Sequence, residues 1–485
     1  MSLSQQALVG VLWASLEKFG GRTINFIVAI FLYRLLTPED FGLVALLAIF
    51  LSISLILIDS GFSQALVRED QILEKDKSTV FYINLILALS IFIVIWFSAP
   101  FISDFFEEPV LLWLARFLAL SPLFSSIAII QRVHFTHKIN FRTQAFINLI
   151  SASLSGLSAI SLALYGFGVW ALATQYVLLA FVSSFLFWGV HPWLPKGFVY
   201  KDSFKKLFNF GSKLMLSSLI NTSFVQGYKV IIGKLYSTTI LGYYSQAENL
   251  NNIISQNLVG ILTRVVYPTL SKVQDDGERL KKAYIQIIKV TSLVVFPAAL
   301  GLALVAEPMI LTLVGKKWIN SVPIIQILTF SALIYHLQVF NLDILKVIGR
   351  SDLFLKLEII KKIGVTVAII IGLYFGFTGL IILQVVSSYF ALFINMRYTS
   401  KILKYSKLNQ FKDVFSVLVL SIPMVIAIFL IDTIKMESNG FRLFILFLTG
   451  VVVYLGTVWI VKPTPFKDLI GLLKPRFPVL NKINL

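Results

Sequence analysis

The 485-residue sequence contains no cysteine and only four histidines. Without cysteine the chain can form neither a disulfide nor a thiolate metal or redox site. His134 and His137 form an H-x-x-H pattern in a basic segment, but no third ligand is nearby, so a solvated loop is the better interpretation. The glycine-rich phosphate loop with its lysine is also missing, which argues against nucleotide hydrolysis. Because catalytic constellations are missing, we do not expect an enzyme.

Charged residues are scarce as well. They make up 14% of the chain, against roughly a quarter in a soluble domain. Hydrophobic residues make up 57%, and the mean hydropathy is +0.85. The composition therefore predicts an all-α polytopic membrane protein. The opening MSLSQQALVG has no basic segment and no small-residue cleavage site, so we expect no cleaved signal peptide.

Apolar stretches long enough to cross a bilayer recur along the whole chain, since a helical span needs about 20 residues. About fourteen transmembrane helices are predicted, near residues 10–33, 41–60, 79–100, 109–130, 143–165, 168–190, 212–233, 241–262, 284–306, 320–344, 353–375, 378–396, 413–431 and 441–461. An even number of spans places both termini on one side of the membrane.

The basic residues indicate which side that is. With a cytoplasmic N-terminus, 29 of the 42 Lys and Arg residues fall in cytoplasmic segments and only 6 in outer loops. Cytoplasmic loops of membrane proteins carry such an excess, so we expect both termini in the cytoplasm. The net charge of +18 is explained by this orientation, and nucleic acid is not expected as a partner.

An internal repeat divides the chain. LLTPEDFG from Leu35 resembles LYSTTILG from Leu235, and LYGFG from Leu164 resembles LYFGF from Leu373. We predict two six-helix bundles in the same orientation, related by a pseudo-two-fold axis along the membrane normal with a cavity between them, plus two additional C-terminal helices. The predicted parts are residues 1–190 (first bundle), 191–211 (a basic interfacial linker on the cytoplasmic side), 212–397 (second bundle) and 398–485 (two helices and a basic tail).

Polar residues at helical spacing mark three of the spans. A cation facing lipid near the middle of the bilayer costs about 2.5–3.5 kcal/mol, so such residues should face a hydrated cavity. Cationic groups can hold a phosphate, and amides can bind sugar hydroxyls. The predicted cavity residues are Lys18, Arg22 and Asn25 in the first span, Gln226 and Lys229 in the seventh, and Glu248, Asn249 and Asn252 in the eighth.

Simpler roles are open for these and other intramembrane charges. Glu17 and Lys18 could pair with each other, and polar residues often join helices. Arg116 and Lys289 lie near span ends, where long side chains reach the membrane surface. Asp59 and Asp343 are expected to cap a helix or to form ion pairs.

Several segments resemble one known family. They are LLTPEDFG from Leu35, GFGVWALATQ from Gly166, IIGKLYSTTILGYYSQAENL from Ile231, VVYPTLSKVQDD from Val265 and GRSDLFLKLEIIKK from Gly349. Together they resemble the polysaccharide-transport branch of the multidrug/oligosaccharidyl-lipid/polysaccharide exporter superfamily, the Wzx-type bacterial flippases.

This resemblance implies a multi-pass flippase of the bacterial inner membrane. It would move undecaprenyl-pyrophosphate-linked oligosaccharides from the cytoplasmic to the periplasmic leaflet by alternating access, for O-antigen, capsule or exopolysaccharide biosynthesis. Lys18, Arg22 and Lys229 match the cationic lumen residues of such proteins in type. Neither a catalytic motif nor a cofactor is implied, and the coupling ion could be H⁺ or Na⁺.

The implied partners are the lipid-linked oligosaccharide and membrane lipids, together with the polysaccharide polymerase and chain-length machinery; we expect a monomer. One alternative is a cation-coupled multidrug exporter of the same superfamily, which would favour carboxylates in an apolar lumen. The other is a membrane-embedded glycosyltransferase or ligase, which would need acceptor-activating carboxylates. The sequence leaves the sugar, the surface polymer and the organism open.

Overall fold

The computed structural model describes residues 20–434 and 436–473, and all regular structure in this part of the chain is helical. The predicted all-α class is therefore confirmed. The chain forms two compact units, Met1–Ser245 and Gln246–Leu485, and the boundary between them lies inside one helix, α11 (Thr238–Asn252).

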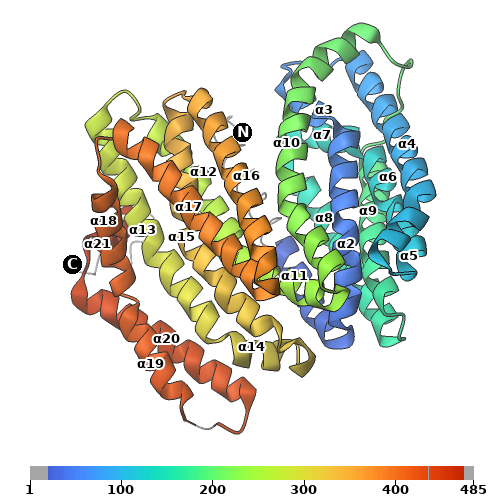
Figure 1. Ribbon diagram of the computed structural model, residues 1–485. Coiled ribbons are helices and arrows are strands. Elements are labelled where there is room, and N and C mark those ends of the chain that lie inside the picture. Colours follow the sequence, from blue (N-terminus) through green and yellow to red (C-terminus); the bar gives the residue numbers. More distant parts are fainter. Residues whose placement is uncertain (1–19, 435, 474–485) are drawn as a thin grey trace. The chain divides into compact units, whose positions relative to one another are not determined.

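In the described part of the first unit, the first helical residues are 20–35. It continues with α2 (Pro38–Asp59), α3 (Phe62–Arg68), α4 (Glu74–Phe106), α5 (Val110–Leu118), α6 (Leu120–Ile127), α7 (Ile129–His137), α8 (Phe141–Leu164), α9 (Val169–Val190), α10 (Lys201–Leu235) and the start of α11 (Figure 1). In Figure 1 the long helix α10 runs beside α2, in agreement with the extensive packing between the two.

The second unit takes the rest of α11 and then one turn of π-helix. Its elements are η1 (Ile253–Leu258), α12 (Val259–Ser271), α13 (Gly277–Leu304), α14 (Ala306–Leu313), η2 (Lys316–Trp318), α15 (Ser321–Val347), α16 (Ser351–Tyr374), α17 (Gly376–Ile402), α18 (Lys407–Val419), α19 (Ile422–Asp432), α20 (Asn439–Val461) and α21 (Thr464–Leu473). Its core contains Tyr284, Phe296 and Phe340, contributed by α13 and α15.

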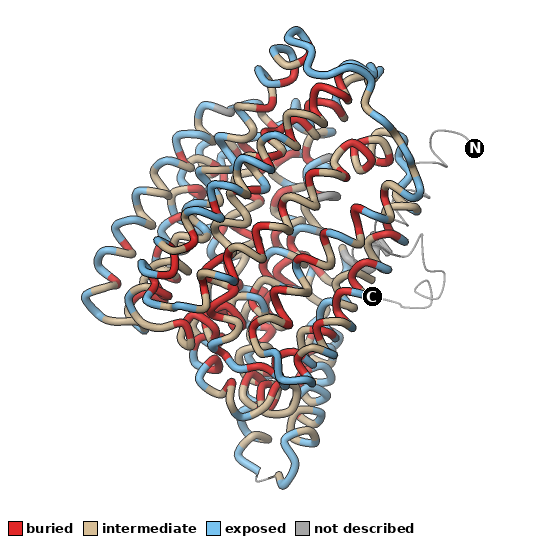
Figure 2. Tube along the Cα trace, turned by 90° about the vertical axis from the view of Figure 1, so that its right-hand side faces the viewer, coloured by how far each residue is buried: buried red, intermediate tan, exposed pale blue. Residues whose placement is uncertain are grey.

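Ten helices in the described part are long and apolar enough to cross a membrane, among them α2 and α3 together as Pro38–Arg68. The surface agrees, because Phe97, Phe101 and Ile460 are 71%, 75% and 80% exposed. Figure 2 shows buried and exposed residues mixed along individual helices. The protein is thus a multi-pass membrane protein.

The other four predicted spans overlap with four helical segments of the structure. These are residues 20–35, α10, the continuous segment α11–η1–α12, and α16. They are not among the ten apolar helices. Three of them were predicted to be polar spans that line a cavity. Fourteen crossings therefore stay a prediction.

The predicted linker 191–211 stays a prediction; within it residues 191–200 are non-helical, and α10 begins at Lys201. This irregular segment is fixed to α4: the backbone N–H of Lys196 donates to Ser78 Oγ (2.9 Å), and that of Tyr200 to Thr79 Oγ1 (3.0 Å). With 35 residues α10 is about 52 Å long, well beyond the roughly 30 Å of the hydrocarbon core. The bundle limits at 190 and 212 stay predictions.

The internal repeat is confirmed around residues 35–42 and 235–242. The first copy ends one helix at Leu35 and begins α2 at Pro38; the second ends α10 at Leu235 and begins α11 at Thr238. Equivalent hydroxyls cap the two new helices. Thr37 Oγ1 accepts from the Asp40 N–H (3.3 Å), and Ser237 Oγ accepts from the Ile240 N–H (3.0 Å). The two sequences thus build the same helix-turn-helix.

Candidate functional site

The helix over residues 20–35 carries two of the predicted cavity residues, Arg22 and Asn25. Arg22 is half-buried and Asn25 is exposed, and their three-residue spacing places them on one face. The side of the helix that carries Gly20 packs on α8, because a Cβ added at Gly20 would lie 3.0 Å from Leu149 Cδ2. Lys18, the third predicted residue of this stripe, lies outside the described residues.

α10 carries the next two, Gln226 and Lys229. Both side chains are half-buried, and they too are three residues apart on one face. Lys229 lies six residues before the end of α10 at Leu235, and Arg22 lies thirteen residues before the helix end at Leu35. Along the helix axis the Lys229 backbone therefore lies about 9 Å from its helix end, and the Arg22 backbone about 20 Å from the equivalent end. The first unit thus carries cations at two distances from equivalent helix ends.

Glu248, Asn249 and Asn252 lie on the part of α11 that belongs to the second unit. Asn249 is exposed, and the other two are half-buried. The helix then widens into the π-helical turn η1, where Ser255 Oγ donates to the Asn251 carbonyl oxygen (3.1 Å). Such turns within α-helices are frequent at functional sites. Nothing in the sequence predicted this one.

Sequence reasoning also missed two polar residues on the same continuous segment. Gln246 and Asn251 are buried, and within the described residues neither the Gln246 amide nor Asn251 Oδ1 has a hydrogen-bond partner. Buried polar atoms in native structures are nearly always satisfied, so partnerless ones call for a ligand, water or another conformation. Both belong to the amide-rich run from Ser245 to Gln256, but they lie off the face that the spacing argument selected.

Polar contacts on the predicted outer side join the residues after α4 to the end of α10 and the start of α11. Lys234 Nζ lies 2.7 Å from Glu107 Oε1, and Thr238 Oγ1 donates to Glu108 Oε1 (3.1 Å). The hydrogen bond from Lys234 lowers the pKa of Glu107 below its ordinary value. Glu107 and Glu108, directly after α4, thus contact the second copy of the repeat.

Charges that we did not assign to the cavity have other partners. Arg116 Nε donates to the Trp96 carbonyl oxygen (3.2 Å), and its guanidinium lies over the rings of Trp96 and Trp113. Asp59 accepts from the Ser63 N–H (3.2 Å) in the first turn of α3, and Asp343 pairs with Lys346 (3.0 Å) as predicted.

Lys289 forms a 2.7 Å ion pair with Asp413 of α18, and its expected reach to the membrane surface stays a prediction. One expectation is wrong. His134 lies on a helix, α7, instead of a solvated loop, and its ring centroid is 3.8 Å from that of His191. No group of metal-ligating residues forms among the described residues.

Comparisons with known proteins agree with this architecture. The sequence profile of a family described as "Polysaccharide biosynthesis protein" matches residues 31–323. The teichuronic acid biosynthesis protein TuaB of Bacillus subtilis (strain 168) is 27% identical over 355 residues, which cover 73% of each chain. The succinoglycan biosynthesis transport protein ExoT of Rhizobium meliloti (strain 1021) is 26% identical over 360 residues, covering 74% of this chain and 73% of ExoT.

Among solved structures, lipid II flippase MurJ in an inward closed conformation superposes with a TM-score of 0.75. The match covers 95% of this chain and 100% of MurJ at 16% sequence identity, so it shows a common fold. The resemblance found in the sequence is confirmed by the family profile. The chain belongs to the polysaccharide biosynthesis protein family.

Proposed function

We propose that this protein is a flippase for undecaprenyl-pyrophosphate-linked oligosaccharides. It carries them from the cytoplasmic to the periplasmic leaflet of a bacterial inner membrane by alternating access, for surface polysaccharide biosynthesis. The observation that carries the proposal is the pair of half-buried cations, Arg22 and Lys229, within helices of a protein of this family. The names of TuaB and ExoT, which refer to polysaccharide biosynthesis and transport, support it.

The chemistry of the proposed substrate agrees with the cations and amides among the predicted cavity residues. A pyrophosphate is a compact polyanion that needs cations to leave water, whereas an oligosaccharide needs many hydrogen-bond donors and acceptors. In the proposal Arg22 and Lys229, with Lys18, hold the pyrophosphate. Asn25, Gln226, Glu248, Asn249 and Asn252 contact sugar hydroxyls.

The proposal includes both termini in the cytoplasm, no covalent chemistry, and a conformational cycle coupled to H⁺ or Na⁺. It also includes delivery of the flipped unit to a polysaccharide polymerase. The orientation rests on the excess of Lys and Arg in the predicted cytoplasmic loops.

A deletion strain tests the proposal. We expect it to lose the surface polymer and to accumulate the lipid-linked repeat unit, with the oligosaccharide on the cytoplasmic leaflet. Wild-type protein should restore both. A deletion strain that makes normal polymer in the absence of a second flippase gene would refute the proposal, and the sugar of the accumulated unit would identify the substrate.

A further inference from the structure

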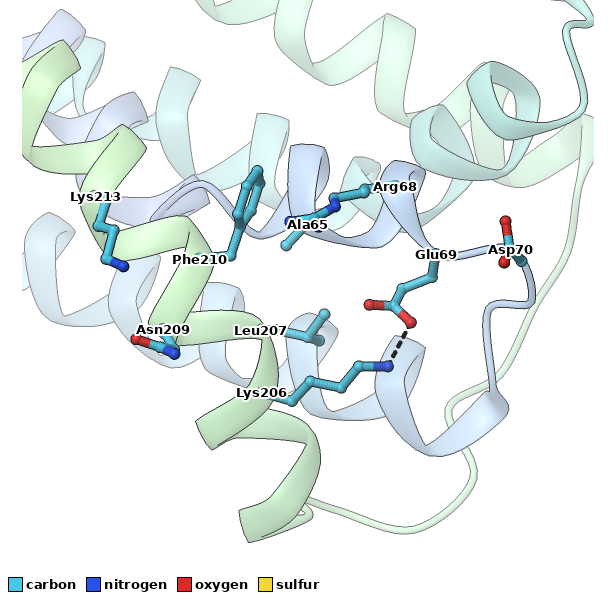
Figure 3. A pocket seen from close by; sticks show the side chains of 9 residues that line it. All are labelled: Ala65, Arg68, Glu69, Asp70, Lys206, Leu207, Asn209, Phe210 and Lys213. Atoms are coloured by element: carbon cyan, nitrogen blue, oxygen red, sulfur yellow. Dashed lines mark hydrogen bonds and ion pairs between the residues drawn. The ribbon is translucent and has the colours of Figure 1, made fainter. Parts of the chain in front are cut away.

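A pocket of about 460 Å³ lies between α3 and the first turns of α10, within the first unit. Its lining consists of Ala65, Arg68, Glu69, Asp70, Lys206, Leu207, Asn209, Phe210 and Lys213 (Figure 3). The volume lies within the range of about 300–1,000 Å³ that is usual for small-ligand sites. None of these residues belongs to the predicted cavity.

Two glycines near the pocket bring the start of α3 and α10 close together. A Cβ on Gly61 would lie 2.4 Å from the Gly211 carbonyl oxygen, and one on Gly211 would lie 2.5 Å from that of Ser60. The two backbones therefore touch at this point. Beside it Phe62 and Leu207 are buried in a common apolar cluster, which holds α3 and α10 together. The two helices that line the pocket are thus held together by tight backbone packing and by a shared apolar core.

The charges in the pocket leave two cations without a carboxylate partner. Lys206 forms an ion pair with Glu69, as the dashed line in Figure 3 shows. Arg68 lies over the ring of Phe210, with 4.8 Å from Cζ to the centroid. Within the described residues neither Arg68 nor Lys213 forms an ion pair, so both can bind an anion.

The pocket lies where the apolar part of the chain ends. Arg68 is the last residue of the apolar stretch Pro38–Arg68. Lys213 stands at the start of the predicted span 212–233, and the neighbouring segment 191–200 exposes Leu194 and Phe198. Cations beside exposed aromatic and aliphatic side chains are typical of the boundary between acyl chains and lipid head groups.

We propose that this pocket binds the phosphate of an anionic phospholipid of the cytoplasmic leaflet. Arg68 and Lys213 contact the phosphate from two different helices, and Phe210, Leu207 and Ala65 meet the first carbons of the lipid. Polar head-group atoms reach Asn209 and Asp70 at the rim. The bound lipid would fix the cytoplasmic end of α10 to α3. The site does not depend on the transported substrate.

Binding of phosphatidylglycerol to purified full-length protein in mixed micelles, followed by native mass spectrometry, tests this site. We expect the double variant Arg68→Gln/Lys213→Gln to bind phosphatidylglycerol about 25-fold more weakly, since each cation near a lipid surface contributes about fivefold. The matched control Lys201→Gln/Lys205→Gln removes the same number of charges from α10, outside the pocket, and it should bind nearly as the wild type does. Binding of phosphatidylcholine should be equal in all three proteins.

Three results would overturn the proposal. The first is that the pocket variant binds phosphatidylglycerol like the wild type. The second is that the control loses as much affinity as the pocket variant, which would mean that the overall charge of the protein causes the effect. Inorganic phosphate could also bind as tightly as phosphatidylglycerol, which would make the site one for a free ion. Equal melting temperatures of the proteins in phosphatidylcholine verify that the variants are folded. No transport is measured, so the result is independent of the proposed flippase activity.

Discussion

Gly42 and Gly242 occupy equivalent positions in one reciprocal contact. A Cβ on Gly42 would lie 1.8 Å from the Thr238 carbonyl oxygen, and a Cβ on Gly242 would lie 1.9 Å from the Pro38 carbonyl oxygen. Thr238 and Pro38 are themselves equivalent, since each is the first residue of its helix. The N-terminal turns of α2 and α11 therefore pack backbone against backbone around a local two-fold axis. Only glycine leaves room for this approach.

The first prediction concerns these glycines. Gly42→Ala and Gly242→Ala should each lower the free energy of unfolding by about 1–3 kcal/mol, the usual cost of overpacking. Both residues belong to one contact, so the first substitution already separates the two helices and the second costs less. The double variant should therefore lose less free energy of unfolding than the sum of the two single variants. Thermal unfolding of the purified protein measures this.

Gly456→Ala is the matched control for the glycine variants, because nothing lies within 4 Å of a Cβ at that position on α20. It should melt like the wild type or slightly higher, since alanine favours a helix over glycine. Equal melting temperatures of Gly42→Ala and the wild type would show that the two backbones are not in contact.

The second prediction concerns the Lys289–Asp413 ion pair, whose side chains are only 25% and 29% exposed. Removal of one partner leaves a half-buried charge without a counter-ion, so Lys289→Met or Asp413→Leu alone should cost about 1–3 kcal/mol. The double variant Lys289→Met/Asp413→Leu should be closer to the wild type than either single variant. A double-mutant cycle of thermal unfolding measures the coupling, and additive losses would mean that the pair is not formed.

The third prediction concerns pH. Burial, followed by the nearby His191, lowers the pKa of His134 from 6.5 to about 4. Between these two values the unfolded chain binds a proton that the folded chain rejects, so stability should fall as the pH drops from about 6.5 towards 4. Above pH 6.5 this group should contribute no pH dependence. Melting temperatures measured from pH 8 to pH 5 will show the decline.

His134→Gln provides the comparison, because an amide of similar size does not titrate in this range. Its melting temperature should change less between pH 8 and pH 5 than that of the wild type. Parallel curves for the two proteins would assign the acid sensitivity to other groups, such as His191, whose pKa burial also lowers.

The sequence predicted the helices well because their signals are local. Long apolar stretches depend on neighbouring residues only. The start of α10 at Lys201 was missed for a related reason. The amphipathic stretch 201–211 lacks the unbroken apolar character of a span, but it forms regular helix by packing on α3.

The site was less predictable, because partners distant in sequence decide what a charge does. Lys289 is neutralised by Asp413, and Lys206 by Glu69, across more than one hundred residues in each case. The close approach of α3 and α10 beside the pocket likewise depends on Gly61 and Gly211, which are 150 residues apart. No periodicity in the sequence reports such pairs. Helical spacing did place Arg22 with Asn25 and Gln226 with Lys229 on common faces.

The central claim is that Arg22 and Lys229 carry a pyrophosphate-linked oligosaccharide through the membrane. Its most direct test is flipping of the purified lipid-linked unit in proteoliposomes, measured as the rate at which the oligosaccharide becomes accessible on the opposite leaflet. We predict that Arg22→Ala and Lys229→Ala each reduce this rate at least about tenfold, because each removes a charge that stabilises the pyrophosphate in the membrane. Lys282→Ala, an exposed cation in a predicted cytoplasmic segment, should flip at the wild-type rate. Wild-type rates in both Arg22→Ala and Lys229→Ala would contradict the account.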